Sequence, residues 1–594
     1  MNFLKTFLAG LLAFVVGSVL TFFLWIIVLI GIFAMTSGSD SVVVPANSIL
    51  KIDLAETLTD APSTDPMAGF DFMSMSKTSQ LPLYKALCAI DAAAADDRIE
   101  GIYLRMNGTG GVESLAVLEE LREALVSFKE SGKFIVSYNE TYGQGGYYLA
   151  SAADKIYLQP QGGMDWMGLS QELMFYKGLL DKLGVKAEVF RPTVCKYKSA
   201  VEPYILDKMS PANREQMQQL VNSMWKSLSS KVAEARGIDY DALQRMTDEL
   251  QVVLPEEALE KGFVDSLLYE DQMDDVFAEL GVETNEDGSY NYVSLGDYAS
   301  QLSADVKNLS APQVAIVYAS GSIVDGEGSD GDIYGNTLAR KLSEVRKDED
   351  IAAVVLRVNS PGGSALASDL IWREMELLKA EKPVIVSMGG YAASGGYYIS
   401  CPADVIVADR MTLTGSIGVF GLMFNLHDAL TDKLGITVDG VRSNASASVS
   451  IANPLTAAQR AASMRSVDKV YETFTTNVAN GRNLEIDHVL DIAGGRVWSG
   501  DDAKGIGLID DYGGLKAAIA LAADKAELGD GYRITEQVDQ PEGLAAILAS
   551  LEAQVRAKIK CSQLGILTED YERMREVLSQ EGIRMYCPYK VEIK

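Results

Sequence analysis

The sequence predicts an α/β protein that consists of a tandem duplication of one unit, preceded by a single N-terminal transmembrane helix. Three observations predict this: an uncharged apolar segment near the N-terminus, two sets of matching motifs in the same order, and apolar runs alternating with amphipathic stretches. At 594 residues the chain exceeds what one hydrophobic core supports, so several domains are expected. Hydrophobic residues make up 48% of it and charged residues 23%, as is usual for folded proteins.

The N-terminal segment carries no charge between Thr6 and Ser39, and most of its residues are apolar. It exceeds both the ~20 residues that cross a bilayer and the ~7–15 apolar residues of a cleavable signal peptide. We therefore expect an uncleaved membrane anchor over residues 1–40. Lys5 before the span and Asp40 after it favour a cytoplasmic N-terminus, which places the rest of the chain on the periplasmic side of a bacterial inner membrane.

The chain contains an internal duplication, which is visible when residues 101–111 are aligned with residues 352–363. Further matches follow in the same order: GQGGYYLASAADKIYL with ASGGYYISCPADVIVA, one DKLG with a second, and ALEKGFVD with AKGIGLID. In each copy, short apolar runs typical of strands alternate with amphipathic helical stretches. This alternation indicates a unit with mainly parallel strands.

The duplication sets the expected domain boundaries. A first α/β repeat is expected over 41–285 and a second over 313–540, with a polar, turn-rich linker at 286–312 between them. Residues 541–594 have no counterpart in the repeat, and their periodicity predicts a helical tail. Its default role is packing or an oligomer contact, with no part in the chemistry.

Charge and cysteine content argue against some classes of function. The 52 basic and 82 acidic side chains give a net charge of −30, which repels phosphate backbones and argues against nucleic acid as a partner. The five cysteines form no C-x-x-C pair, and no Walker or HExxH motif occurs, so neither a metal nor another cofactor is expected. Cys561 and Cys587 both lie in the C-terminal tail, and whether they pair stays open.

A candidate nucleophile, Ser394, lies in the sequence YAASGGYYIS. A strand expected to end near Met388 runs into a turn of small residues and then a helix, which would present the serine at a helix N-terminus. The N–H groups of Gly395 and of Gly362 or Gly363, in the turn NSPGG, are candidate donors of an oxyanion hole. Taken alone, the Ser394 pattern is equally compatible with a glycine-rich turn without function, and the NSPGG pattern favours such a turn.

A nucleophilic serine needs a base, and the sequence restricts the choice. The two histidines, His427 and His488, fall in helical patterns and are interpreted as structural, which disfavours a Ser-His-Asp triad without excluding it. Lys196 and Lys198 lie among apolar neighbours in VCKYKSAVEPY, where burial would lower a lysine pKa from its usual ~10.4. Surface lysines on a loop are the alternative interpretation.

The two repeats have diverged in a complementary way. Gln144, which cannot attack a carbonyl, occupies the position of Ser394 in the first copy. The part of the second copy that corresponds to Lys198, within 444–449, contains no lysine. One copy thus holds the candidate base and the other the candidate nucleophile, which predicts a single composite site shared by the two repeats.

The sequence resembles the signal peptide peptidase A family, also called protease IV, in its long double-domain bacterial form. The resemblance covers nearly the whole chain after the anchor, and its most specific segments are YKSAVEPY, RVNSPGGS, AASGGYYIS and LTGSIGVFG. It implies a crotonase and Clp-protease fold, a dyad of Ser394 and Lys198, and a Ser416 hydroxyl that orients the lysine. It also implies a membrane-anchored homotetramer that hydrolyses cleaved signal peptides and other hydrophobic or unfolded peptides without a cofactor.

Two other functions stay open at this point. A crotonase-type acyl-CoA enzyme would use similar glycine-rich N–H groups, although an extracytoplasmic location offers no CoA. A catalytically inactive scaffold that binds membrane peptides is the alternative from another class. It is favoured if the side chains of Ser394 and Lys198 lie far apart, so the distance between them is the discriminating observation.

Overall fold

The computed structural model describes residues 43–53, 57–63, 70–71, 76–77, 80–105, 112, 114–302, 310–328, 331–447, 449–538, 583–587 and 589, with Gly17, Ser18 and Thr21 near the N-terminus. The chain divides into residues 1–45 and 46–594, and the elements below belong to the second unit. The predicted anchor lies outside the described residues, apart from the three just named. No helix in the described part of the chain is long and apolar enough to cross a membrane.

The first repeat is built on a parallel sheet of six strands in the order β10-β8-β7-β6-β1-β11. Apolar side chains point to both faces of its central strands and are buried, as expected of a parallel sheet covered on both sides. The strands are β1 (Ser48–Asp53), β6 (Ile99–Arg105), β7 (Phe134–Tyr142), β8 (Lys155–Met164), β10 (Ser266–Leu267) and β11 (Asn291–Ser294).

The second repeat has the same strand order, β22-β18-β17-β15-β12-β23, again with parallel neighbours. This equivalence, strand by strand, confirms the predicted tandem α/β duplication. The strands are β12 (Gln313–Ser320), β15 (Ile351–Ser360), β17 (Val384–Ala393), β18 (Val405–Ala408), β22 (Asp511–Tyr512) and β23 (Arg533–Gln537). Strand β17 also pairs with β19 (Leu413–Gly415), which pairs with β21 (Val497–Ser499).

Part of the segment expected to be a linker belongs to the first sheet. Strand β11 pairs in parallel with β1 and corresponds to β23 of the second repeat. Helix α11 (Leu295–Leu302) follows it directly. The sequence NYVS gave no apolar signal because β11 is an edge strand with three of its four side chains at least partly exposed.

Equivalent helices in the two repeats begin at serines that cap them. Ser114 Oγ accepts a hydrogen bond from the Val117 N–H at the start of α3 (Leu115–Lys129). Ser364 Oγ does the same for the Ala367 N–H at the start of α13 (Ala365–Lys379). The other helices of this layer are α2 (Leu83–Ala95), α4 (Gln144–Ala150), α12 (Gly335–Lys347) and α14 (Gly395–Ser400).

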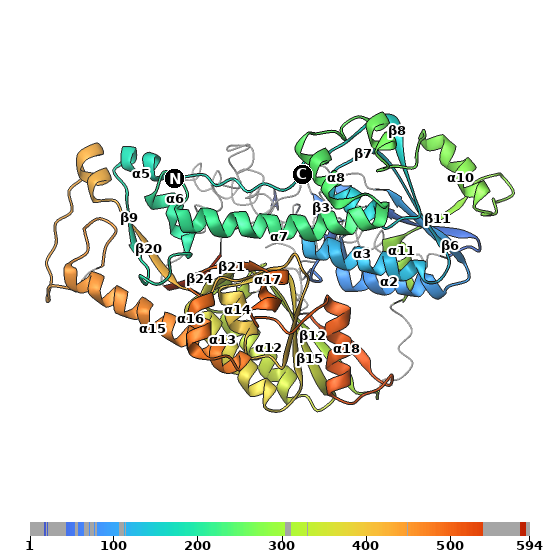
Figure 1. Cartoon of the computed structure of the whole chain (residues 1–594). Coiled ribbons are helices and arrows are strands. Elements are labelled where there is room, and N and C mark those ends of the chain that lie inside the picture. Colours follow the sequence, from blue (N-terminus) through green and yellow to red (C-terminus); the bar gives the residue numbers. More distant parts are fainter. Residues whose placement is uncertain are drawn as a thin grey trace, which may run out of the picture. The chain divides into compact units, whose positions relative to one another are not determined.

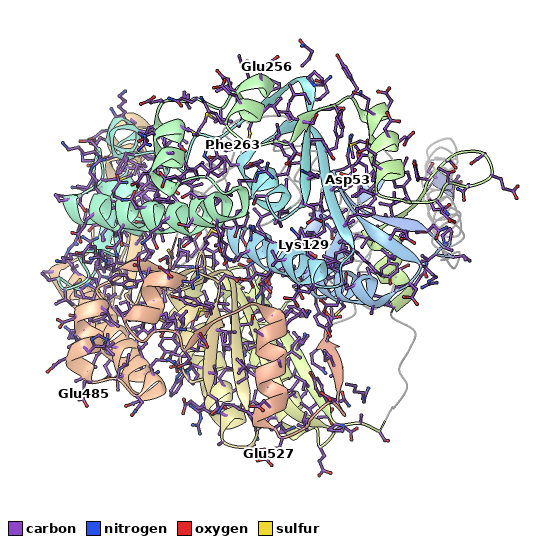
Figure 2. The ribbon with its side chains drawn as sticks, turned by 45° about the vertical axis from the view of Figure 1, so that its right-hand side comes forward. Asp53, Lys129, Glu256, Phe263, Glu485 and Glu527 are labelled. Atoms are coloured by element: carbon purple, nitrogen blue, oxygen red, sulfur yellow. The ribbon has the colours of Figure 1, made fainter. Side chains whose placement is uncertain are left out.

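The long helix α7 (Pro211–Arg236) belongs to the first repeat and also contacts the second. It begins at Ser210, whose side chain accepts a hydrogen bond from the Asn213 N–H. Figure 1 shows α7 between the sheets of the two repeats, and in Figure 2 the labels Phe263 and Glu485 mark the first and the second repeat. The helix packs against β21, so it holds the segment that precedes it, which includes the candidate lysine, against the second repeat.

A buried ion cluster also joins the repeats. Arg357 on β15 donates hydrogen bonds to Asp60 at 2.5 and 2.9 Å and to Glu120 at 2.6 Å, and both carboxylates belong to the first repeat. Burial is the largest influence on Glu120 and on the nearby Asp409, and it raises the pKa of both carboxyl groups. Separating the repeats, or docking them in another orientation, would leave a buried charge unpaired at a cost in free energy. The cluster therefore favours the observed arrangement of the two repeats.

A third sheet combines both repeats with the C-terminal segment, in the order β14-β13-β16-β24-β20-β9. A helical tail was expected over 541–594, but Ile583–Tyr586 forms strand β24, and the helical pattern at 544–559 lies outside the described residues. The two sheet edges that receive this strand could not be recognised from the sequence. The other strands are β9 (Lys186–Phe190), β13 (Ile323–Val324), β14 (Ile333–Tyr334), β16 (Gly362–Ser364) and β20 (Phe420–Asn425).

Candidate active site

Ser394 lies at the sharp turn between β17 and α14. Its backbone has φ 57° and ψ −112°, a conformation that L-residues rarely adopt, and its N–H donates to the Gly415 carbonyl at 2.8 Å. A Cβ on Gly396 would lie 2.6 Å from the Ser360 carbonyl oxygen, so the helix can start this close to β15 only with glycine there. The strand continues to Ala393, beyond its predicted end near Met388, and the turn is correspondingly tight.

Lys198 lies directly beside Ser394. Its Nζ donates to Ser394 Oγ at 2.6 Å, to Ser416 Oγ at 2.9 Å and to the Ser416 carbonyl at 3.0 Å. The lysine is 1% exposed and Ser394 is 0% exposed. Burial lowers the pKa of Lys198 from 10.5 to about 8, so about a tenth of the amine is neutral at pH 7. A neutral amine at this distance can accept the hydroxyl proton.

The backbone around Lys198 is held by the second repeat. The Tyr197 N–H donates to the Gly494 carbonyl at 3.0 Å, and a Cβ on Gly495 would lie 2.5 Å from Lys198 Cβ. Arg191 donates to the Lys198 carbonyl at 2.8 Å. These two glycines were not among the predicted site residues, although a Gly-Gly pair after the helical pattern LEIDHVLDI is a signal for a close backbone approach.

A buried polar network supports the lysine from α7. Gln216 Nε2 donates to Ser199 Oγ at 2.7 Å, and Ser199 Oγ donates to Asn213 Oδ1 at 2.9 Å. Gln216 Oε1 accepts a hydrogen bond from the Val497 N–H of β21 at 3.2 Å. These residues could not be recognised from the sequence, because polar side chains on a helix normally indicate a solvated face.

The three candidate oxyanion glycines converge at the turn. A Cβ on Gly395 would lie 3.1 Å from Gly362 Cα and from Gly363 N, so the two backbone segments touch. Gly362 has φ 95°, and its N–H donates to Ser360 Oγ at 3.1 Å. The Gly362 N–H already has an acceptor, and Gly363 is paired with neighbouring strands opposite Met585 and Ile323, so Gly395 is the best-placed candidate for holding an oxyanion.

The other candidate bases point elsewhere. The ring of His427 hydrogen bonds to the Ala452 carbonyl at 3.0 Å, and that of His488 to the Ile506 carbonyl at 3.0 Å. Lys196 is exposed, with its Nζ 4.9 Å from the centre of the Tyr197 ring. Among the described residues, neither these histidines nor Lys196 hydrogen bonds to Ser394, so the geometry favours a Ser-Lys pair.

Residues 127–283 and residues 376–529 match peptidase family S49, with one match in each repeat. The chain belongs to peptidase family S49. It is 35% identical over 582 residues to "Protease 4" of Salmonella typhi, covering 94% of this chain and 93% of that protein. It is 36% identical to "Protease 4" of Haemophilus influenzae, covering 84% of this chain and 82% of that protein. The family and these relatives make it a serine protease.

Two more distant similarities cover only part of the chain. The "Putative signal peptide peptidase SppA" of Enterococcus faecium is 33% identical over 34% of this chain and 58% of its own length. A solved structure of a ClpP1 mutant from Listeria monocytogenes aligns with 13% identity over 34% of this chain and 94% of that chain, at a TM-score of 0.23. A score this low carries no argument, so the crotonase and Clp-protease subtype of this S49 fold stays a prediction.

In the first repeat, Gln144 occupies the position that aligns with Ser394. Its Oε1 accepts hydrogen bonds from the Met167 N–H at 3.0 Å and the Gly168 N–H at 2.7 Å, and its Nε2 donates to the Gly168 carbonyl at 2.9 Å. The amide of Gln144 therefore hydrogen bonds to the backbone of Met167 and Gly168, at the position that corresponds to Ser394 in the second repeat. Only one Ser-Lys pair is formed between the two S49 repeats in the described part of the chain.

Replacing Ser416 by alanine is expected to lower kcat for peptide hydrolysis by about 10²-fold, because Lys198 Nζ loses an acceptor that holds it in line with Ser394. The KM should stay within about two-fold, since in the mechanism proposed below Ser416 binds the lysine and no part of the peptide. Steady-state kinetics of Ser416→Ala and of the exposed control Ser443→Ala test this. A loss of activity in both variants, or in neither, would contradict the assignment.

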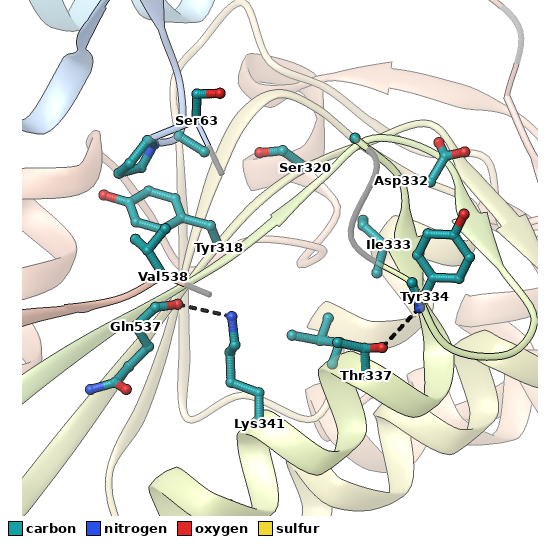
Figure 3. Close-up of a pocket in the computed structure, with 15 residues that line it drawn as sticks. Ser63, Tyr318, Ser320, Asp332, Ile333, Tyr334, Thr337, Lys341, Gln537 and Val538 are labelled. Carbon is teal, nitrogen blue, oxygen red and sulfur yellow. Dashed lines mark hydrogen bonds between the residues drawn. The ribbon is translucent and has the colours of Figure 1, made fainter. Parts of the chain in front are cut away.

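A separate cavity of about 240 Å³ lies at the end of β12 and beside α12, where residues 61–63 of the first repeat meet the second repeat. Figure 3 shows Lys341 on its floor, donating to the Gln537 carbonyl at 3.1 Å. Across the cavity, the Gly328 N–H donates to Thr337 Oγ1 at 3.2 Å. None of the candidate site residues lines this cavity, so it is distinct from the Ser-Lys site.

Proposed function

We propose that this S49 peptidase hydrolyses cleaved signal peptides and other apolar or unfolded peptides through a dyad of Ser394 and Lys198. The observation that carries the proposal is the 2.6 Å contact between Lys198 Nζ and Ser394 Oγ. The lowered pKa of the buried lysine supports it, because a base must be neutral to accept a proton. The name of the Enterococcus faecium relative supports the substrate class.

In the proposed mechanism, neutral Lys198 accepts the hydroxyl proton of Ser394 while Oγ attacks the scissile carbonyl carbon. The N–H groups of Gly395 and of Gly362 or Gly363 stabilise the oxyanion. The protonated lysine then donates its proton to the leaving amine. Lys198 next takes a proton from water, which attacks the acyl-enzyme and releases the second product with Ser394 restored. Ser416 keeps the amine aligned throughout.

The proposal includes the location and assembly of the enzyme. The uncharged apolar sequence supports a single-pass anchor over residues 1–40, with the catalytic part on the periplasmic side of a bacterial inner membrane. A homotetramer built from crotonase- or Clp-protease-like units follows from the family resemblance. We keep the second repeat at 313–540 and extend the first beyond residue 285 to include β11 and α11. In the proposal, the first repeat supplies the lysine and the second the serine.

Two rival functions make different demands on the site. An inactive peptide-binding scaffold has no need for a buried lysine next to a serine, an arrangement that costs free energy because burial opposes the charged amine. An acyl-CoA enzyme would require a thioester substrate that the proposed periplasmic location does not supply. Both rivals therefore remain less well supported than a peptidase.

The proposal is tested by incubating the detergent-solubilised full chain with a quenched fluorescent peptide that carries an apolar signal-peptide segment. We expect cleavage that is insensitive to a metal chelator and to the absence of nucleotide, and that is retained in His427→Ala. A tightly folded protein should resist cleavage under the same conditions. Binding without cleavage would instead indicate a scaffold, and hydrolysis of an acyl-CoA in place of the peptide would indicate a crotonase-type enzyme.

A further inference from the structure

Gln216 is a buried residue of α7 that makes hydrogen bonds in two directions. Its side chain is 1% exposed. The amide Nε2 donates to the Tyr197 carbonyl at 3.0 Å and to Ser199 Oγ at 2.7 Å, so it holds the residues on both sides of Lys198. The amide oxygen Oε1 accepts a hydrogen bond from the Val497 N–H at 3.2 Å. One side chain of the first repeat therefore joins the lysine segment to strand β21 of the second.

Val497 connects this side chain with the two serines of the site. Val497 lies opposite Gly415 in the pairing of β19 with β21, and the Gly415 carbonyl accepts the Ser394 N–H at 2.8 Å. The preceding carbonyl, that of Arg496, accepts the Ser416 N–H at 2.7 Å. A displacement of β21 would therefore move the backbone of both serines.

Both serines have backbone conformations that depend on their surroundings. Ser394 has φ 57° and Ser416 has φ 51°, in the left-handed region that residues with a Cβ seldom adopt. Such conformations persist only where the neighbouring structure fixes them. The contact between α7 and β21 is part of that structure, so it contributes to keeping the two serines in place.

We propose that Gln216 is a positioning residue for the peptidase reaction, which holds the Lys198 amine in line with the Ser394 hydroxyl by joining the lysine segment to β21. This inference rests on the proposed function, because it assumes that Lys198 is the base. The 2.6 Å contact between the two reacting groups spans two repeats, so it depends on how the repeats are held against each other. Gln216 acts through this arrangement and touches neither reacting group.

The chemistry of an amide suits this role better than simple packing does. An apolar side chain would pack α7 against β21 without the cost of removing a polar group from water. Hydrogen bonds, in contrast, fix direction as well as distance. The donors of Gln216 point to the lysine segment and its acceptor points to β21. A misplacement of 1 Å between reacting groups can cost about 10²-fold in rate, so this fixing of direction matters for turnover.

The same arrangement keeps water away from the amine. Burial lowers the pKa of Lys198 to about 8, and loosening of the lysine segment would admit water and raise this pKa toward the ordinary 10.5. The other titratable groups that act on the amine are the thiols of Cys195 and Cys587. Burial raises the pKa of both, to about 11 for Cys195, so both stay neutral near pH 8. A rise of kcat/KM near pH 8 therefore reports the lysine.

Gln216→Met tests the proposal, because methionine fills a similar volume and suits a helix but makes none of these hydrogen bonds. We expect kcat for the apolar peptide to fall about 10–100-fold at pH 7. The KM should stay within about two-fold, since Gln216 acts on the lysine segment and not on the peptide. The rise of kcat/KM should move from near pH 8 to a higher pH, by about one unit.

The matched control is Ser229→Ala, at another buried polar residue of α7. Ser229 is 0% exposed, and its Oγ donates to the Trp225 carbonyl at 2.7 Å and accepts from Gln244 Nε2 at 3.3 Å, about 20 Å further along the helix. Its loss should lower the unfolding temperature and leave the pH profile unchanged. If Gln216→Met also lowers only the unfolding temperature, with the same pH profile as the wild type, its role is structural and the proposal is overturned.

Two further variants separate this inference from the proposed function. Ser199→Ala removes one oxygen that accepts from Gln216, so it provides the same measurement if Gln216→Met does not fold, and its pH profile should move in the same direction. Lys198→Met should abolish the rise near pH 8. A rise that persists in Lys198→Met would refute the lysine base of the proposed function. A rise that is lost in Lys198→Met but unmoved in the folded Gln216 and Ser199 variants would refute only the positioning role.

Discussion

Ser394→Ala is expected to lower kcat/KM for peptide hydrolysis by about 10⁴-fold or more, the largest effect of any single substitution in this chain. The variant retains the backbone turn and the buried lysine but loses the oxygen atom that forms the acyl-enzyme. Peptide binding should persist, because the sheet edges and the glycine N–H groups are unchanged. The measurement is steady-state cleavage of the quenched peptide, with binding followed separately by anisotropy.

A companion variant, Ser394→Gly, separates the chemistry from the backbone strain at this turn. It should be as inactive as Ser394→Ala, yet unfold at a higher temperature. Glycine adopts the observed φ of 57° without steric cost, and the strain relieved is on the order of 1 kcal/mol after the greater flexibility of unfolded glycine is subtracted. Residual activity above about 1% of wild type in either variant would show that Ser394 is not the nucleophile.

Lys198→Met is expected to reduce kcat/KM by about 10³–10⁴-fold while stabilising the protein at neutral pH. Methionine fills a similar volume and needs no proton. The lowering of the lysine pKa from 10.5 to about 8 corresponds to about 3 kcal/mol of burial cost for the charged form. The variant avoids this cost. Exposed Lys196→Met is the control and should change neither activity nor stability appreciably.

The pH dependence of this lysine has a definite sign. Its pKa in the folded protein lies below that in the unfolded chain, so between about pH 8 and 10.5 the unfolded state binds more protons and wild-type stability rises with pH. The advantage of Lys198→Met in free energy of unfolding should therefore be largest below pH 8 and shrink toward pH 10.5. Wild-type kcat/KM should rise through pH 8, and a fall over that range would contradict a lysine base.

The composite site could be predicted from the sequence because the duplication supplied an internal comparison. Gln144 opposite Ser394, and the missing lysine opposite Lys198, each meant little alone. Together they indicated a site shared by two repeats. The structure places Lys198 Nζ 2.6 Å from Ser394 Oγ, although 196 positions separate the two residues in the chain. No local pattern could have given that distance.

The other residues around the site could not be predicted from the sequence. Asp60 and Glu120, which meet Arg357 in the interior, look like ordinary surface carboxylates until the two repeats are docked. Strand β24 has only four residues, and its partners Gly362–Ser364 lie more than two hundred positions earlier. Such pairings depend on which edges of the folded sheet are open, and this is a property of the tertiary structure.

The division of the dyad between two repeats has a consequence for synthesis. A ribosome completes the first repeat, with the lysine alone, well before the serine has emerged. With the proposed dyad, a half-made chain thus holds a base with no nucleophile to activate and cannot attack neighbouring proteins. In the proposed mechanism, docking of the repeats creates the active site, so folding itself performs the role that removal of a pro-segment performs in zymogens.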